Sequence, residues 1–120
     1  VVYSAEHGFA GRFDLFFRRR AEEGVLFSEP RRSLLDLKTS NWVGPSFAIQ
    51  LNLYRLGALE CGLFEEVDEL IVLHVKPDGT FDEIEVPIRP DWALTALRSY
   101  QHGKELGDWA RSTYKRKAAA

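Results

Sequence analysis

The chain has 120 residues and is 45% hydrophobic, enough to bury one core, so we expect a single domain over residues 1–120. Its formal net charge of -2 lacks the basic excess that many nucleic-acid-binding domains carry. No apolar run reaches the length of a membrane span and no leader segment opens the chain, which predicts a cytoplasmic protein without a membrane partner. The single cysteine, Cys61, excludes an intramolecular disulfide and suits a reducing compartment.

The first quarter of the chain reads as β-structure. Residues 1–4 predict a short strand, and turn chemistry at His7 precedes a second, Phe-rich strand over residues 10–18, so the two predict a hairpin. The polar stretch over residues 19–32 is broken by glycine and proline, with room for a brief strand over residues 25–27.

The middle of the chain predicts a strand followed by a helix. Ser33 to Thr39 is apolar enough to lie in the middle of a sheet. Pro45 lies in a helix start signal, and the segment from Phe47 to Glu60 is long enough for about four turns. Apolar residues occupy nearly its whole circumference, which is typical of a mostly buried helix.

The last part of the chain predicts two strands and a helix. Residues 69–75 and 81–88 read as strands joined by a proline- and glycine-containing turn. An amphipathic helix then extends over residues 92–114, and Gly103 and Gly107 favour a kink or a break in its middle. The order strand, strand, strand, helix, strand, strand, helix predicts an α/β (mixed α+β) fold, with a central mixed β-sheet flanked by helices.

Two carboxylates and a lysine stand out against this apolar background. Asp36 and Lys38 are two residues apart on a predicted strand, so both side chains point to the same side. Asp14 is a second isolated carboxylate in an otherwise apolar segment. These side chains are the components of a metal-assisted phosphodiester hydrolysis site. Gln50 and Tyr54 are four residues apart on the following helix, hence on one face, and both need polar partners.

Each of these residues also has a purely structural interpretation. Asp36 and Lys38 could form a simple ion pair, which is worth little at a surface. Asp14 could pair with a neighbouring arginine on the solvent face, and the Gln50–Tyr54 pair could face solvent or bond internally. The position of Asp36 between leucines favours a functional role, because a central strand does not bury a carboxylate without a partner for it.

Three short motifs resemble those of the PD-(D/E)XK nuclease superfamily, and most closely its RecB-type exonuclease branch. Gly11-Arg12-Phe13-Asp14 is similar to the Gly-x-x-Asp strand of that branch, Asp36-Leu37-Lys38-Thr39 to its Asp-x-Lys-Thr, and Gln50 with Tyr54 to its Gln-x-x-x-Tyr. The three motifs occur in the family's order and together are specific. The resemblance implies a restriction-endonuclease-like core, in which the N-terminal helix that usually precedes the first strand has no counterpart here.

The resemblance also implies a set of roles. Asp14 and Asp36 would be the carboxylate ligands of Mg²⁺, with Mn²⁺ as a substitute, and the carbonyl of Leu37 would be the third protein ligand. Lys38 would orient or deprotonate the attacking water, Gln50 would lie near the metal and the lysine, and Tyr54 would face the nucleic-acid backbone.

The function implied is a metal-dependent nuclease that hydrolyses DNA phosphodiester bonds through a Mg²⁺-activated water. The resemblance favours an exonuclease of recombination or repair, of the kind found in phages and bacteria, which reads phosphates and not bases. Two other hypotheses stay open: a catalytically inert nucleic-acid-binding relic of the fold, and a structural or protein-interaction domain. Strand preference, cleavage polarity, exonuclease against endonuclease action, DNA against RNA and oligomeric state are also left open.

Other candidate residues carry weaker signals. Glu6 and His7 stand just before the Gly-x-x-Asp segment and are near enough in sequence to reach the site, although polar residues are common in turns. His74 is expected to be a core or edge histidine and His102 a helix-surface residue. Trp42 follows the Asp-x-Lys strand, where it would either stack on a base or pack against the fold.

Overall fold

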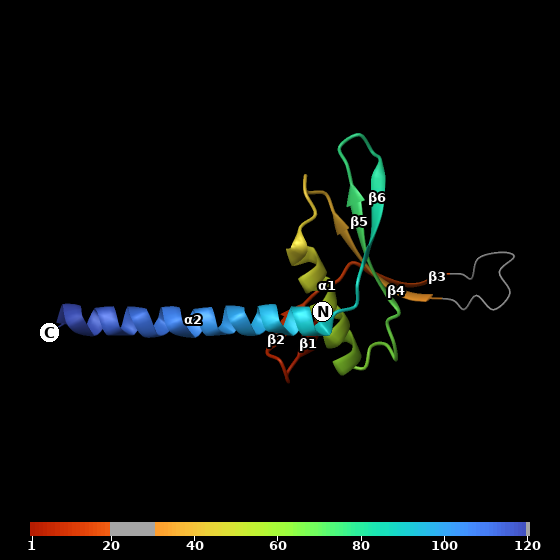
Figure 1. The fold of residues 1–120 in the computed structure, drawn as a ribbon. Helices are drawn as coiled ribbons and strands as arrows, with labels where there is room; N and C mark the ends of the chain where they lie inside the picture. Colours follow the sequence, from red (N-terminus) through yellow and green to blue (C-terminus); the bar gives the residue numbers. More distant parts are fainter. Residues whose placement is uncertain (20–30, 120) are drawn as a thin grey trace, which may run out of the picture.

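The computed structural model describes residues 1–19 and 31–119, so the brief strand expected over residues 25–27 lies outside the described residues. In chain order the elements are β1 (Val2–Ser4), β2 (Phe9–Gly11), β3 (Leu15–Arg19), β4 (Arg31–Lys38), α1 (Pro45–Glu60), β5 (Glu69–Val75), β6 (Phe81–Val86) and α2 (Pro90–Ala119) (Figure 1).

The central sheet has four strands in the order β3-β4-β5-β6. β3 and β6 pair antiparallel with their neighbours, whereas β4 and β5 are parallel, with Ser33 opposite Glu69 and Lys38 opposite His74. Parallel neighbours need a crossover connection, and α1 lies within it. The predicted mixed α+β class with a mixed sheet and helices is confirmed.

The prediction of one strand over residues 10–18 was wrong in one respect, because this segment forms two strands that belong to two sheets. β2 pairs with β1 in a separate two-stranded antiparallel sheet, with Gly11 opposite Val2. The expected hairpin therefore consists of β1 and β2 and does not include β3. β3 pairs with β4 in the main sheet. The chain changes sheet just before β3, where the Asp14 carboxylate accepts a hydrogen bond from the backbone N–H of Leu37 at 2.7 Å.

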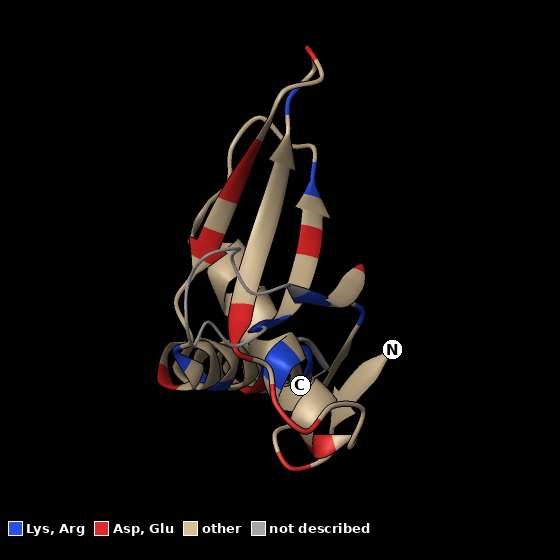
Figure 2. Cartoon of the chain, turned by 90° about the vertical axis from the view of Figure 1, so that its right-hand side faces the viewer, with Lys and Arg blue, Asp and Glu red and all other residues tan. Residues whose placement is uncertain are grey.

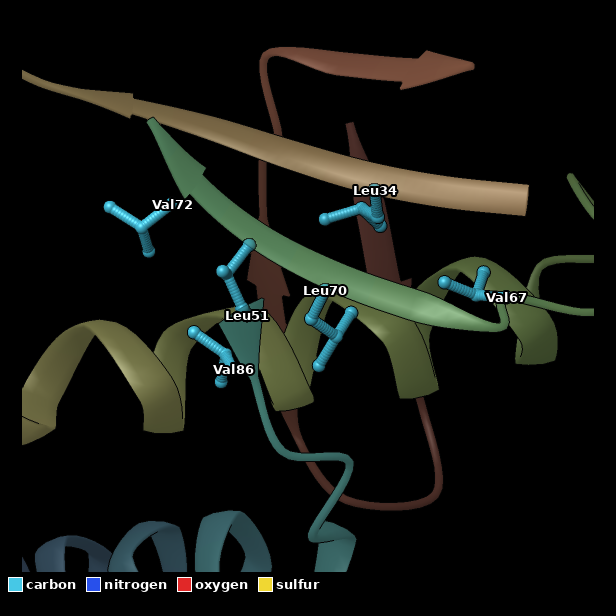
Figure 3. Packing of buried hydrophobic residues seen from close by; sticks show 6 residues of the cluster. All are labelled: Leu34, Leu51, Val67, Leu70, Val72 and Val86. Carbon is cyan, nitrogen blue, oxygen red and sulfur yellow. The ribbon is translucent and has the colours of Figure 1, made fainter. Parts of the chain in front are cut away.

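The core lies between the four-stranded sheet and α1 (Figure 3). Alternate residues of the strands face the helix, and the buried cluster consists of Leu34, Leu51, Val67, Leu70, Val72 and Val86. On another side α1 packs against the β1–β2 hairpin and α2. These contacts explain the apolar circumference of α1, although only four of its residues are fully buried.

One buried polar residue ties α1 to the chain that leads into α2. The Asn52 amide nitrogen donates to the carbonyls of Ala48 and Pro87 at 2.9 and 3.0 Å. Its carbonyl oxygen accepts from the backbone N–H of Arg89 at 2.7 Å. All of its hydrogen-bonding groups are used, so this asparagine has a structural role.

The expected interruption of the last helix does not occur. α2 continues through Gly103 and Gly107 and extends away from the body of the fold (Figure 1). Tyr100, Leu106 and Trp109 on it are exposed. Within residues 1–19 and 31–119, no helix combines the length and the apolarity needed to cross a membrane.

Candidate active site

Asp36 and Lys38 face the α1 side at the C-terminal end of β4. The Lys38 ammonium lies 2.7 Å from Oδ2 of Asp36, and the two side chains are 21% and 6% exposed. Lys38 Nζ also donates a hydrogen bond of 3.1 Å to Oε1 of Gln50 and lies 4.8 Å from the centre of the Phe47 ring. The lysine is therefore held from two sides by α1 and by its own strand.

Oδ2 of Asp36 is a buried acceptor that is not properly satisfied. Although Lys38 Nζ is close, Oδ2 accepts no hydrogen bond of regular geometry from any described residue. The contact between the two is thus an ionic one without a well-directed N–H. Because buried carboxylate oxygens normally have hydrogen-bond partners, an orphaned one at the edge of a sheet is suited to a cation.

Asp14 supplies the second carboxylate. Its hydrogen bond from the Leu37 N–H is the main cause that lowers the pKa of Asp14, and its interaction with the Asp36 carboxyl lowers this pKa further. Burial raises the pKa of Asp36; the Lys38 ammonium offsets this rise in part, and Asp14 adds to it. The pKa values of the two interacting carboxyl groups are thus shifted in opposite directions, Asp14 downward and Asp36 upward, and a cation bound between them would favour the ionised form of both.

The protein atoms at this position fit a hard divalent cation. Within the described parts of the chain, no three His, Cys, Asp or Glu side chains converge as a metal-binding group. Mg²⁺ needs fewer, because one or two carboxylates with waters and a carbonyl oxygen complete its shell. The N–H and C=O groups of one strand residue point to the same side, so the Leu37 carbonyl lies on the edge of β4 that faces Asp14.

Gln50 and Tyr54 extend the site along α1. Gln50 Nε2 donates to the Tyr54 hydroxyl at 2.6 Å, while Gln50 Oε1 accepts from Lys38. The amide orientation is determined by this lysine, because an ammonium can only donate. Asp36, Lys38, Gln50 and Tyr54 thus form one continuous row, and the backbone of Leu37 connects Asp14 to it. The structure brings together all five side chains that the motifs predicted.

The sequence did not reveal why Gly11 belongs to the first motif. A Cβ built on Gly11 would lie 2.2 Å from Cε1 of Tyr54. The tyrosine ring therefore rests against the Gly11 backbone, and only glycine leaves room for it. The first motif thus supports the third through a packing contact, and the only signal for this in the sequence was a glycine three residues before Asp14.

Other candidates lie away from this row. The backbone N–H of Glu6 donates to the carboxylate of Glu60, near the C-terminal end of α1 and about 15 Å along the helix from Gln50. His74 lies 2.6 Å from the carbonyl of Ser40 through Nε2, which is a structural contact. Among the described residues, no ion pair joins Asp14 to Arg12 or Arg18, the pairing that a structural role for Asp14 requires.

The charged residues of the edge strand β6 are all acidic (Figure 2). Asp82, Glu83 and Glu85 lie on β6, and Arg18 lies on β3 at the opposite edge. β4, the neighbour of β3, begins with Arg31 and Arg32 and ends at the candidate site. The acidic β6 edge disfavours the approach of a polyanion, whereas Arg31 and Arg32 are paired with Glu69 and Asp68.

Comparisons with known proteins identify no relative of this chain. No family model matches it, and neither a curated protein nor a solved structure is similar to it at a significant level. The resemblance to the PD-(D/E)XK superfamily therefore depends on the three motifs.

Proposed function

We propose that the protein is a metal-dependent nuclease that hydrolyses DNA phosphodiester bonds, with an exonuclease role in recombination or repair of the phage or bacterial type. One observation carries the proposal. At the end of β4, two carboxylates interact beside a lysine, and one of them has a buried oxygen without a regular hydrogen bond. A structural ion pair needs neither the second carboxylate nor the orphaned oxygen.

Asp14, Asp36 and the Leu37 carbonyl would hold Mg²⁺ or Mn²⁺ in this function. The ion would supply Lewis-acid activation of a water molecule and of the phosphate. Only the ionised carboxylate of Asp36 is a ligand, so a proton and the cation compete for it. The raised pKa of Asp36 therefore makes metal binding weaken as the pH falls.

Lys38 and Tyr54 retain hydrogen-bond donors for the substrate. An ammonium has three N–H donors; Gln50 takes one and Asp36 faces another, so one is left for the attacking water or a phosphate oxygen. The Tyr54 hydroxyl accepts from Gln50, so its own proton can be donated to a backbone phosphate. Donors fixed in advance toward developing negative charge stabilise the transition state of such a reaction.

The test is cleavage of end-labelled linear DNA by the purified chain in Mg²⁺, Mn²⁺ or EDTA. We expect metal-dependent degradation that Asp36→Asn and Asp14→Asn abolish. Glu69→Gln is the matched control, because Glu69 is also a buried carboxylate on the same strand pair but lies at its other end. A folded wild-type chain that is inactive in both metals, or Asp36→Asn with full activity, would overturn the proposal.

A second function is favoured by a different observation. The absence of a third acidic or histidine side chain at the site, among the residues that the structure describes, suits an inert nucleic-acid-binding domain. Such a domain would bind DNA equally well in Mg²⁺ and EDTA without cutting it. A protein-interaction domain would do neither, and Asp36→Asn would then alter only its stability.

A further inference from the structure

Trp42 exposes a large aromatic surface in the loop between β4 and α1. Its side chain is 70% exposed, although tryptophan contributes most to stability when it is buried. Among the described residues, the indole takes part in no ring stack and no hydrogen bond, and only its backbone carbonyl is bonded. A packing role alone does not account for such a residue at this place.

The loop that carries Trp42 has the candidate site at both of its ends. It follows Lys38, the last residue of β4, and ends where α1 begins at Pro45; Phe47 in the first turn of α1 has its ring centre 4.8 Å from Lys38 Nζ. Trp42 follows Lys38 by four residues, so their Cα atoms are at most about 14 Å apart. Trp42 therefore lies in the loop that adjoins the candidate site.

The loop backbone is also anchored on both sides of residue 41. The Ser40 hydroxyl donates to the carbonyl of Trp42 at 3.0 Å. The carbonyl of Ser40 in turn lies 2.6 Å from Nε2 of His74 on β5. An aromatic ring fixed before binding loses little conformational entropy when a ligand stacks on it.

Gly44 lies directly against the indole. A Cβ built on Gly44 would be 2.4 Å from Cζ3 and 2.5 Å from Cη2 of Trp42. The ring thus lies across backbone that has no side chain, which covers one side of it. The high exposure of Trp42 shows that the other side is open to solvent.

We propose that Trp42 is a stacking platform for an unpaired nucleobase of the DNA strand whose backbone passes Lys38 and Tyr54. The inference rests on the proposed nuclease function and adds its substrate class. Bases inside a duplex are already stacked on both faces, so only an unpaired or frayed base can lie on the indole. Stacking tolerates any base, in agreement with a site that reads phosphates. The protein should therefore prefer single-stranded ends to blunt duplex ends.

The first test measures binding of a labelled oligothymidine to the full chain in EDTA, where no cleavage interferes. Stacking on one aromatic side chain predicts that Trp42→Ala weakens binding by about 5- to 150-fold. Trp42→Phe should restore most of the affinity because it keeps an aromatic face. Trp109→Ala is the matched control, because Trp109 is 67% exposed but lies on α2. Equal affinity of wild type and Trp42→Ala, or an equal loss in Trp109→Ala, would overturn the proposal.

The second test observes the indole directly. In a Trp92→Phe, Trp109→Phe double variant, Trp42 is the only tryptophan left. The oligothymidine should quench its emission, and a blunt hairpin duplex of the same length should quench it much less. Absence of quenching by the single strand contradicts the proposal.

The two proposals fail in different ways. Quenching without cleavage in Mg²⁺ would reject the nuclease and keep the stacking platform. Cleavage that Trp42→Ala leaves unchanged on single-stranded ends would reject the platform and keep the nuclease.

Discussion

The two ends of the parallel β4–β5 pair each bury a carboxylate, but the surroundings of the two carboxylates differ. At the first end, Glu69 is 6% exposed and accepts a 2.6 Å hydrogen bond from the Ser33 hydroxyl, and Arg31 lies 3.4 Å away. At the other end, Asp36 is 4% exposed and interacts with a second carboxylate. One of its oxygens lacks a regular hydrogen bond despite the nearby Lys38.

This difference separates a structural acid from a candidate functional one. Glu69 has partners that compensate for its burial, so it contributes to the joining of the two strands. Asp36 lies where burial and a like charge both disfavour ionisation, as the raised pKa records. Arrangements that cost stability are typical of binding and catalytic sites.

Of the substitutions that test this difference, we expect the largest effect on activity from one at Lys38, beside Asp36. Lys38→Met removes the donor directed at the substrate but keeps much of the side-chain volume, so we expect the rate of DNA cleavage to fall by about 10²- to 10³-fold. Binding of Mn²⁺ should be retained, because both carboxylates stay. Single-turnover kinetics together with metal titration check this. A rate within a few-fold of wild type would show that Lys38 only neutralises Asp36.

A second prediction concerns the free energy of unfolding of variants at the two ends of the β4–β5 pair. Glu69→Gln should destabilise the fold by about 1–3 kcal/mol, because Ser33 and Arg31 lose a charged acceptor. Asp36→Asn should stabilise it at neutral pH, because the ionised carboxyl is unfavourable where it lies. Since the folded-state pKa of Asp36 is raised, the wild type regains this stability as the pH falls through that pKa toward 3.8.

Thermal unfolding of the two variants between pH 4 and pH 8 measures this difference. The gain of Asp36→Asn over wild type should be largest near pH 8 and should vanish at the acidic end. A gain that grows toward low pH, or destabilisation by Asp36→Asn at every pH, would contradict the claim that the ionised carboxylate of Asp36 destabilises the fold.

The smallest effects are expected where α1 supports the site. Gly11→Ala places a methyl group against Tyr54 and should displace its ring, which lowers the cleavage rate by about tenfold through the loss of the Gln50 contact. Tyr54→Phe keeps the ring but removes the hydroxyl itself, so it should lower the rate at least as much. Gly103→Ala is the control, because a Cβ built on Gly103 would meet no other segment within 4 Å in the described part of the chain; it should leave the rate unchanged and raise stability by about 0.5–1 kcal/mol. Equal rates for Gly11→Ala and Gly103→Ala would show that Tyr54 is not part of the site.

Much of the fold followed from local patterns in the sequence. The strand over residues 69–75 was predicted with its observed bounds, and the α1 prediction began two residues late at Phe47. Helical and strand periodicity together with proline and glycine signals determine such elements. Spacings of two on a strand and four on a helix also placed Asp36 with Lys38, and Gln50 with Tyr54, on one face each. The meeting of the two pairs, which the structure shows, was implied only by the family resemblance.

The features that the sequence did not reveal all depend on tertiary contacts. Residues 10–18 are divided between two sheets at a point where Asp14 bonds to the Leu37 backbone, 23 residues later. The contact of Gly11 with Tyr54 and the three bonds of Asn52 join segments that are far apart in the chain. The helix over Gly103 and Gly107 shows that two glycines did not outweigh the helix formers around them.

The most direct test of the central claim is a Mn²⁺ titration followed by electron paramagnetic resonance. Wild type, Asp36→Asn and Glu69→Gln are compared at pH 8, where Asp36 is most able to bind a cation. We predict that wild type and Glu69→Gln bind the ion and that Asp36→Asn does not. Equal binding by all three proteins, or loss of binding in Glu69→Gln alone, would contradict the assignment of the metal to the Asp14–Asp36 end of the strand pair.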